Sequence, residues 1–310
     1  MESEKERNLC PYAALLAVQA FFGSLPVVAK PVLSVLSAFP LVGIRVGITA
    51  LILFAVQYWR GRIWLRERSD YVRLAILSLF GVTLNQHLFI GGLSLTKASN
   101  TSLLVVTIPI FTLAVSAIVG IERLRLAKVL SIILAAAGVI FLIDPRSASF
   151  SSATTLGDLM IIGSSLSFGI YVATSKAVVT RNGAFRSMMW VFIFASLICV
   201  PLGAFDFYRH DSAVIGPGVW LVVFYIAIFS TAIPYLFNAY ALLHVNPSVV
   251  AVFIYLQPII GVMLAAFFLG EKLDIRFGAA AVLIFAGVYL TTKKAASARS
   301  ETIVGEPPSV

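Results

Sequence analysis

The chain has 310 residues, of which 60% are hydrophobic and 12% are charged. A soluble domain has about 45–50% apolar and about 25% charged residues, so this chain has too little polar surface for a water-soluble globule, and its composition predicts a membrane protein. The formal net charge is +9, but the basic residues lie mainly in short loops between apolar runs. This pattern argues against nucleic acid as a partner and for orientation in a lipid bilayer.

Ten apolar segments follow one another along the chain, each close to the roughly 20 residues that a helix needs to cross the hydrocarbon. A charged cytoplasmic segment, residues 1–11, precedes them, and we expect a disordered cytoplasmic tail at 294–310. Helices are expected because backbone groups in lipid must be satisfied within each segment. The expected helices are 12–33, 39–59, 73–94, 99–120, 126–143, 156–178, 187–207, 217–240, 247–269 and 275–292.

Basic residues are distributed unequally between the two sides of this arrangement. With the N-terminus inside, fifteen Lys and Arg residues fall in inside loops or tails and five fall outside. The stretch from Arg60 to Arg73 contributes most to this difference. Because positive charge favours the cytoplasmic side, the sequence predicts an inner-membrane protein with both termini in the cytoplasm.

The two halves of the sequence are related. A shift of 149 residues aligns Pro109 with Pro258, Glu122 with Glu271, and Gly138 with Gly287. Near the front of each half, a shift of 146 aligns Phe22-Gly23 and Lys30 with Phe168-Gly169 and Lys176. Five helices per half is an odd number, so the halves must insert with opposite orientation. The sequence therefore predicts an all-α membrane protein of ten transmembrane helices in two inverted five-helix repeats, 12–145 and 156–293, as in secondary carriers.

These residues resemble the EamA family of the drug/metabolite transporter superfamily. The resemblance covers about residues 12–292 and implies ten helices in a 5+5 inverted topology, without ATP. It also implies transport of amino acids or similar small metabolites, often as export. The family frequently has Trp where this chain has Phe22 and Phe168, so the aromatic ring is kept without the indole donor. The motifs are Phe22-Gly23 with Lys30, the Arg45 region, Pro109 with Gly120-Ile-Glu122-Arg, and Pro258 with Gly270-Glu271-Lys272 and Gly287.

Three cations, Lys30, Arg45 and Lys176, fall within the expected helices. A cation at the centre of a bilayer costs about 2.5–3.5 kcal/mol on insertion scales, so such residues often mark a substrate pathway. They could attract an anionic substrate group such as a carboxylate, or act in a gate. The alternative is that each lies near a helix end and extends its charge to the headgroups.

Several uncharged polar residues also fall at membrane depth. In the third helix Asn85 and His87 could line a cavity for a hydrogen-bonding metabolite, or bond to neighbouring helices. His87 could also titrate near neutral pH, which makes the proton one possible coupling ion. Prolines at 109 and 258 free backbone carbonyls and are expected to kink their helices. The remaining candidates for the pathway are Tyr235, Asn238, Tyr255 and Gln257.

Glu122 and Glu271 lie at matching positions before the fifth and tenth helices, and we interpret both as structural groups at helix ends. The sequence contains no CxxC, HExxH, Walker A or GxSxG motif. We therefore expect no cofactor, no metal site, no catalytic residues and no enzymatic activity. One chain can enclose a complete pathway, so we expect a monomer.

The favoured hypothesis is a secondary transporter that exports small organic metabolites such as amino acids. One alternative is a non-transporting membrane sensor or partner protein, which would bind another protein and move no solute. The other is a membrane-embedded lipid-modifying enzyme, which would need a nucleophile and a base within reach of its substrate. His87 is the residue whose replacement would test that alternative.

Overall fold

The computed structural model describes residues 2–96, 98–143, 154–209, 215–260, 263 and 275–304. All regular structure within these ranges is helical, and no strand occurs in them. Seven helical stretches are long and apolar enough to cross a membrane, and three shorter apolar helices cover 126–141, 247–260 and 278–292. The expected class, a multi-pass α-helical membrane protein, is confirmed.

The first half of the chain contains helices α1 to α7. Two of the expected spans are interrupted: a π-helical segment, Leu79–Leu84, separates α3 from α4, and a turn at 105–106 separates α5 from α6. The helices are α1 (Glu2–Leu33), α2 (Ala38–Trp59), α3 (Arg68–Ser78), α4 (Asn85–Leu95), α5 (Ala98–Leu104), α6 (Thr107–Ile118) and α7 (Leu126–Ile143).

The second half repeats this pattern. A π-helical segment, Ile228–Ala232, separates α10 from α11, and a 3-10 turn, Phe253–Tyr255, follows α12. The helices are α8 (Thr155–Asn182), α9 (Ala184–Arg209), α10 (Pro217–Ala227), α11 (Ile233–Leu242), α12 (Pro247–Val252) and α14 (Ile275–Val304).

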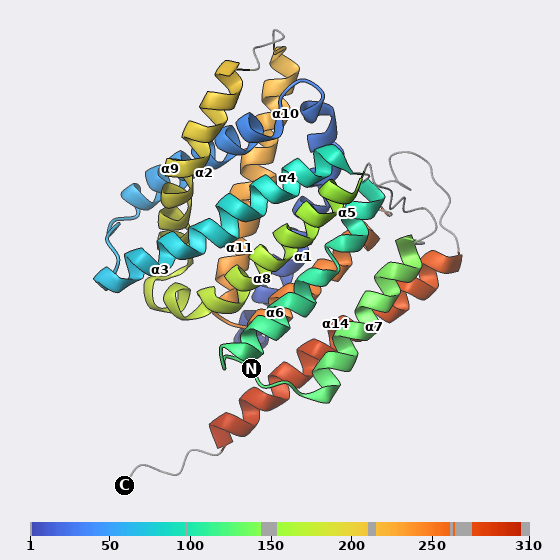
Figure 1. Ribbon diagram of the computed structural model, residues 1–310. Helices are drawn as coiled ribbons and strands as arrows, with labels where there is room; N and C mark the ends of the chain where they lie inside the picture. Colours follow the sequence, from blue (N-terminus) through green and yellow to red (C-terminus); the bar gives the residue numbers. More distant parts are fainter. Residues whose placement is uncertain are drawn as a thin grey trace.

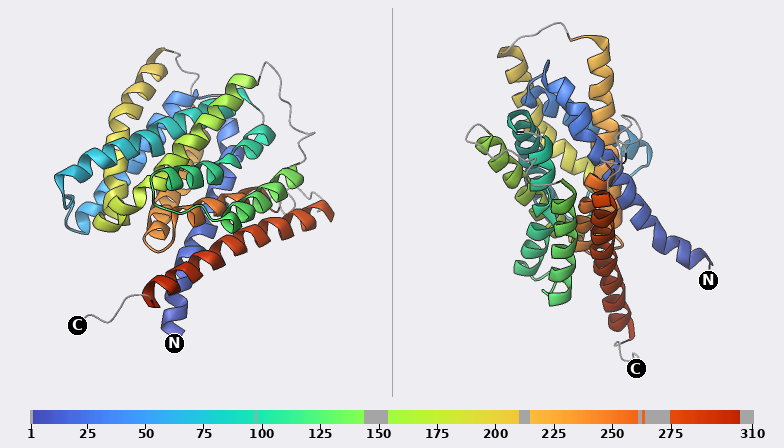
Figure 2. Two further views of the ribbon diagram at one scale, coloured as in Figure 1. Left: turned by 60° about the horizontal axis from the view of Figure 1, so that its bottom comes forward. Right: turned by 90° about the vertical axis from the view of Figure 1, so that its right-hand side faces the viewer.

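Both ends of the chain are more helical than the sequence suggested. The helix α1 begins at Glu2, within the segment expected to precede the first span, and α14 continues to Val304, through most of the tail expected to be disordered. Residues 293–300 contain Lys, Arg and several Ala, which favour a helix, so α14 can continue beyond its apolar part. The start of α1 and the end of α14 lie at the same end of the bundle (Figures 1 and 2).

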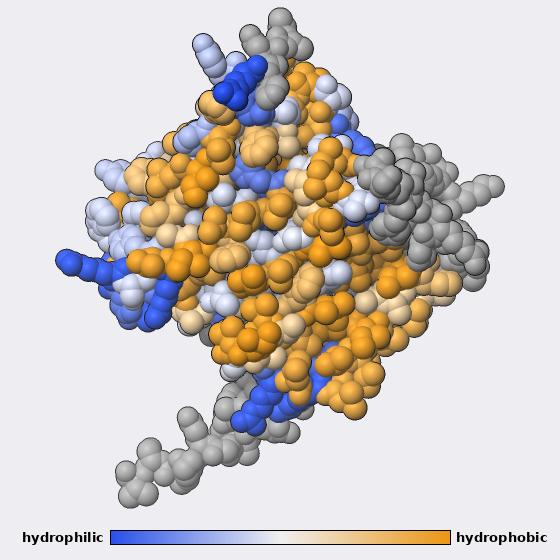
Figure 3. Space-filling view, viewed as in Figure 1, coloured by the Kyte–Doolittle hydropathy of each residue, from blue (hydrophilic) through white to orange (hydrophobic). Residues whose placement is uncertain are grey.

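The outer surface is largely apolar (Figure 3). Leu51, Leu126 and Leu221 are each more than 70% exposed, as expected where lipid replaces water around the helices. Hydrophilic residues gather where α3 begins and where α6 connects to α7 (Figure 3). The apolar surface therefore has polar margins at these two loops, both of which the sequence predicts on the cytoplasmic side.

Positions that match between the halves lie next to one another in space. The rings of Phe22 and Phe168 meet edge to face, with centroids 6.5 Å apart. The Gln86 amide lies 3.4 Å from the hydroxyl of Tyr235, 149 positions later in the chain. The two π-helical segments begin at positions related by the same shift of 149. The related positions thus face one another near the centre of the molecule.

Glycines permit the closest helix contacts. The helices α7 and α14 lie side by side (Figures 1 and 2), and a Cβ at Gly287 would come within 2.6 Å of the Ser131 carbonyl oxygen. Between α2 and α9, a Cβ at Gly43 would lie 2.7 Å from the Cys199 carbonyl oxygen. Both contacts join equivalent helices of the two halves, so small residues hold the halves together.

Candidate functional site

A cavity lies between the two halves, near the middle of the long helices. The space in it that is open to a water-sized sphere is about 70 Å³, so the cavity is narrow in this state. Residues of α1, α2, α4, α8, α11 and the segments around 105–108 and 254–257 surround it. Its polar lining consists of Arg45, Asn85, Gln86, Ser164, Tyr235 and Gln257.

Irregular helix geometry surrounds this cavity. Asn85 and Gln86 directly follow one π-helical segment, and Tyr235 lies just after the other. Such segments are frequent at functional sites because they leave backbone groups free and turn side chains out of register. Here they direct polar side chains of α4 and α11 toward the interface of the halves.

The two predicted proline kinks correspond to interruptions on the other side of the cavity. A turn at 105–106 interrupts the regular helix three residues before Pro109, and a 3-10 turn at 253–255 lies just before Pro258. At the first interruption the Tyr255 hydroxyl donates to the Val106 carbonyl over 3.0 Å. This hydrogen bond joins the second half of the chain to the turn before α6.

Arg45 is the charged group of the cavity. Its side chain is fully buried, with 1% relative exposure of the residue. Nε donates to Thr231 Oγ1 over 2.9 Å and Nη2 donates to the Ser230 carbonyl over 3.1 Å, so the second half of the chain holds the guanidinium. Nη1 is buried without a hydrogen-bond partner, and no carboxylate among the described residues pairs with Arg45.

Amides and a phenol form the rest of the polar wall. The Tyr235 hydroxyl lies 2.6 Å from the Gly81 carbonyl oxygen and 3.2 Å from Asn85 Oδ1, both of which can accept its proton. Asn85 Nδ2 donates to Ser164 Oγ over 2.9 Å. Gln257 donates from Nε2 to Gln19 Oε1 over 2.8 Å. These contacts fix the side chains before any solute arrives, as a binding site requires.

Aromatic rings close the apolar side of the cavity. Phe22 and Phe168 both line it and meet the ring of Tyr235 nearly edge on, at centroid distances of 6.1 and 6.2 Å. The family motif includes these two phenylalanines, but the sequence alone does not assign them to the pathway. Their position next to Arg45 gives the cavity one cationic, one amide-rich and one aromatic surface.

The other predicted pathway residues lie elsewhere. Lys30 is exposed near the end of α1. Lys176 donates from Nζ to the Val245 carbonyl over 2.8 Å and lies 3.2 Å from Asn246 Oδ1, so it ties α8 to the turn before α12. Neither lysine lines the central cavity, whereas Arg45 does.

Three further candidates do not line the cavity: Asn238 and Tyr255 are buried, and His87 is half-buried. His87 Nδ1 lies 2.8 Å from the Thr83 carbonyl oxygen, and its Nε2 is buried without a hydrogen-bond partner. Asn238 has a buried Oδ1 without a partner. Tyr255 is fully buried and engaged with Val106.

The helix-end glutamate Glu122 bridges the halves. Its carboxylate accepts from the backbone N–H of Ser248 over 3.0 Å and from the Ser248 hydroxyl over 2.8 Å, and it pairs with Lys128. It therefore caps α12, a helix of the other half, where a carboxylate stabilises the free N–H groups. Glu271 lies outside the described residues.

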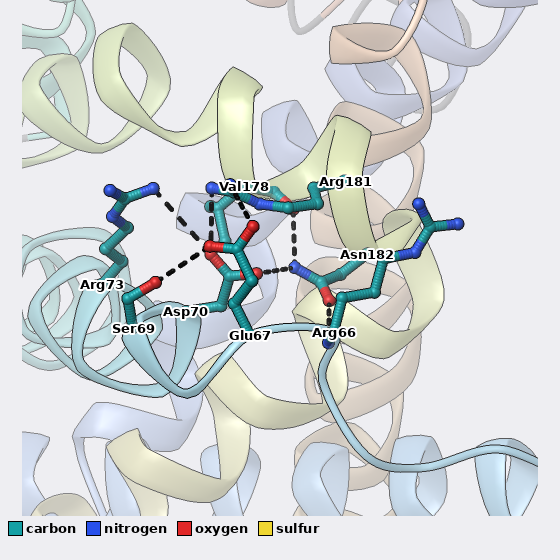
Figure 4. A network of polar contacts seen from close by, with 8 residues as sticks. All are labelled: Arg66, Glu67, Ser69, Asp70, Arg73, Val178, Arg181 and Asn182. Atoms are coloured by element: carbon teal, nitrogen blue, oxygen red, sulfur yellow. Dashed lines mark hydrogen bonds and ion pairs between the residues drawn. The ribbon is translucent and has the colours of Figure 1, made fainter.

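A second interface network was not predicted (Figure 4). Asp70, fully buried in the first turn of α3, accepts from Asn182 Nδ2 over 2.7 Å and pairs with Arg181 at 3.0 Å. Arg181 also pairs with Glu67 at 2.9 Å. The sequence signal was an acid in a helix's first turn within an arginine-rich stretch, but the sequence does not show that α8 ends against it.

These features define a multi-pass helical membrane protein with a polar cavity between two similar halves. The chain belongs to the EamA-like transporter family, whose model matches it twice, over residues 11–144 and 155–293.

Named relatives agree with this membership. The chain is 26% identical over 260 residues to an uncharacterized transporter of Archaeoglobus fulgidus, covering 84% of this chain and 89% of the relative. It is 25% identical over 297 residues to the uncharacterized inner membrane transporter YedA of Escherichia coli, covering 93% of each. A solved crystal structure with 18% identity has a TM-score of 0.76 over 94% of this chain and 98% of that chain, and so shares the fold.

Proposed function

We propose that this protein is a secondary transporter that exports small organic metabolites carrying a carboxylate, such as amino acids, across the inner membrane. The observation that carries the proposal is the fully buried Arg45, which lines the central cavity without a carboxylate partner among the described residues and keeps Nη1 free. A buried guanidinium favours a planar anion that accepts two parallel hydrogen bonds, and a carboxylate has that geometry.

The rest of the cavity suits the remainder of an amino acid or a similar metabolite. Asn85, Gln86 and Gln257 offer amide oxygens and N–H groups, and Gln86 Oε1 is buried without a hydrogen-bond partner. Phe22 and Phe168 supply an apolar surface for a side chain. The proposal therefore assigns the carboxylate to Arg45, the polar groups to the amides and the apolar part to the rings.

The same proposal includes the arrangement of the whole chain. Ten helices in two inverted halves would place the cavity near the bilayer midplane and let the halves exchange roles between two states. The family matches at 11–144 and 155–293 and the contacts between matched residues support this arrangement. The similarity to the inner membrane transporter YedA supports an inner membrane, and the basic loops support a cytoplasmic location of both termini. We propose a monomer as the transporting unit.

Flux measurements in proteoliposomes test the proposal. Vesicles with purified protein receive a mixture of amino acids, amines, sugars and other metabolites, and mass spectrometry follows each solute with and without a proton gradient. We expect movement of a few related carboxylated solutes. An effect of the gradient would identify the proton as the coupling ion and direct attention to His87, whose Nε2 is buried and free.

Empty vesicles and vesicles with heat-denatured protein are the controls. Flux of only amines or sugars would contradict the role of Arg45 while leaving a transporter. Absence of any flux from folded protein would contradict transport itself and favour the sensor alternative.

A further inference from the structure

A second groove lies at the end of the bundle where α2 and α8 end and α9 begins. Residues of α1, α2, α9 and α11 line it, among them Cys10, Gln57, Arg60, Arg186, Phe237 and Tyr240. It shares no lining residue with the central cavity. The groove is therefore a separate feature that the proposed transport function leaves unexplained.

The chain segments next to this groove, 60–73 and 181–186, carry more arginines than acids. Seven lie at positions 60–73 and 181–186, together with two acids, Glu67 and Asp70. Arg181 engages both acids, and Arg73 lies 3.9 Å from Asp70 (Figure 4). Figure 4 also shows the Arg66 guanidinium directed away from this network. The acids are thus already occupied by arginines outside the groove.

Outside residues 2–9, whose side chains the structure does not describe, no carboxylate of the described residues lies within ion-pair distance of the two arginines that line the groove. Both are nevertheless held in place. The guanidinium of Arg60 lies over the ring of Phe185, 4.6 Å from its centroid, and Arg186 donates from Nε to the Arg62 carbonyl over 3.1 Å. Two cations oriented by the protein, rather than mobile in solvent, can bind one anion between them.

The surroundings of the groove identify the source of that anion. Tyr58 is 63% exposed and Trp59 is 87% exposed directly beside Arg60, and exposed Tyr and Trp side chains are typical of the level of lipid headgroups. Deeper along the same groove, Ala13, Leu236 and Phe237 form an apolar lining. A ligand that fits both parts has an anionic head and a hydrocarbon tail.

We infer that this groove binds an anionic phospholipid of the surrounding leaflet, with its phosphate between Arg60 and Arg186 and an acyl chain toward Phe237. Basic pockets between transmembrane helices bind such headgroups, and each nearby cation strengthens the attraction. The loops around the groove carry the chain's largest group of arginines, so the positive-inside rule places it in the cytoplasmic leaflet.

Cys10 offers a readout of occupancy in the unmodified protein, because it lines the groove and is exposed, whereas Cys199 is buried. Purified protein in nanodiscs is labelled with an uncharged maleimide in three conditions: phosphatidylcholine alone, phosphatidylcholine mixed with phosphatidylglycerol, and phosphatidylcholine with inorganic phosphate in the buffer. A Cys10→Ser chain measures labelling elsewhere. We expect phosphatidylglycerol to slow the labelling of Cys10 by about fivefold or more, and free phosphate to leave it unchanged.

Two double variants that remove the same charge show whether the groove arginines cause the slower labelling. R60Q/R186Q should abolish the slowing by phosphatidylglycerol, whereas R123Q/R125Q, which removes the same charge from exposed residues outside the groove, should retain it. Native mass spectrometry of the unmodified protein should in addition show retained phosphatidylglycerol and no retained phosphatidylcholine. If inorganic phosphate protected Cys10 and phosphatidylglycerol did not, the ligand of the groove would be a soluble anion, and the inference of a lipid would be overturned. The inference would be overturned if Cys10 were labelled equally fast in all lipids, or if both double variants lost the protection by phosphatidylglycerol to the same extent. None of these outcomes depends on flux.

Discussion

The guanidinium of Arg45 is a charged group in a fully buried position, where loss of hydration disfavours the charge. Its Nε and Nη2 donate to Thr231 and the Ser230 carbonyl, and the third nitrogen, Nη1, has no hydrogen-bond partner. Leaving a buried donor unpaired costs about 1–3 kcal/mol, more for a charged group. A ligand that accepts from Nη1 would recover part of this cost, so we expect Arg45 to contribute mainly to substrate affinity.

Substitutions at Arg45 test this expectation. Arg45→Gln should raise KM for a carboxylated substrate by roughly tenfold to a hundredfold, because a charge-assisted hydrogen bond contributes about 1.5–3 kcal/mol. The KM of Arg45→Lys should lie between those of the unmodified protein and Arg45→Gln, since an ammonium keeps the charge without the planar fork. Flux in proteoliposomes measures both, with the exposed Arg123→Gln as the control. An equal loss for solutes with and without a carboxylate would assign Arg45 to structure.

Sequence reasoning reached part of this site. Arg45, Asn85, Tyr235 and Gln257 were chosen because polar groups are costly at membrane depth, and the structure gathers all four in one cavity. The same reasoning chose Lys176, which instead binds a loop carbonyl. Depth along a helix can be estimated from the sequence, but the direction in which a side chain leaves the helix depends on neighbours that are distant in the chain.

At the scale of helices, the sequence predicted the spans better than their interruptions. The π-helical segments Leu79–Leu84 and Ile228–Ala232 contain no proline, so no residue type marked them in advance. The sequence also does not show which helices pack against each other. Gly43 and Gly47 lie four residues apart on α2, a spacing that allows a close helix contact, but the partner, α9, is identified only by Cys199 and Gly203 lying against Gly43.

The contact between α2 and α9 provides a test at this scale. In Gly43→Ala the new Cβ would lie 2.7 Å from the Cys199 carbonyl oxygen and 3.2 Å from Gly203 Cα, both backbone atoms that cannot move aside. Overpacking of this kind costs about 1–3 kcal/mol. We expect a lower unfolding temperature in detergent, measured by the loss of helical circular dichroism. Gly218→Ala adds the same methyl group where nothing lies within 4 Å, and should leave that temperature unchanged; equal unfolding temperatures for both variants would contradict the close contact.

For the whole molecule, the internal repeat was the strongest sequence signal. It indicated which positions correspond, and the structure places several of them in contact, including Phe22 with Phe168. It did not indicate how the ends of the bundle are closed. At the end where α2 and α8 stop, Asp70 and Glu67 of the first half engage Arg181 and Asn182 of the second (Figure 4).

The central cavity lies deeper in the bundle than this network. Arg45 is nearer the start of α2 than its end, Asn85 is nearer the end of the α3–α4 stretch, and Ser164 is nearer the start of α8. The Asp70 network therefore lies between the cavity and the end of the bundle that carries most arginines. If the halves move apart at that end during transport, this network has to break, and its strength sets the population of the closed state.

Asp70→Asn should shift the molecule toward opening at this end, because it leaves Arg181 without its buried carboxylate partner. A loss of about 1.4 kcal/mol from the closed state changes its population ratio tenfold. The readout is a Ser164→Cys side chain in the cavity, in a chain without its two native cysteines, labelled by an impermeant maleimide from each side of oriented vesicles. We expect faster labelling from the side of the Asp70 network only.

Asp206→Asn is the control, because it makes the same chemical change at the other end of the bundle. There the Asp206 carboxylate, near the end of α9, accepts a hydrogen bond from Ser37 of the first half. This variant should not increase labelling from the network side. Unchanged labelling in Asp70→Asn, with the fold intact by circular dichroism, would mean that the network only stabilises the fold and does not control access to the cavity.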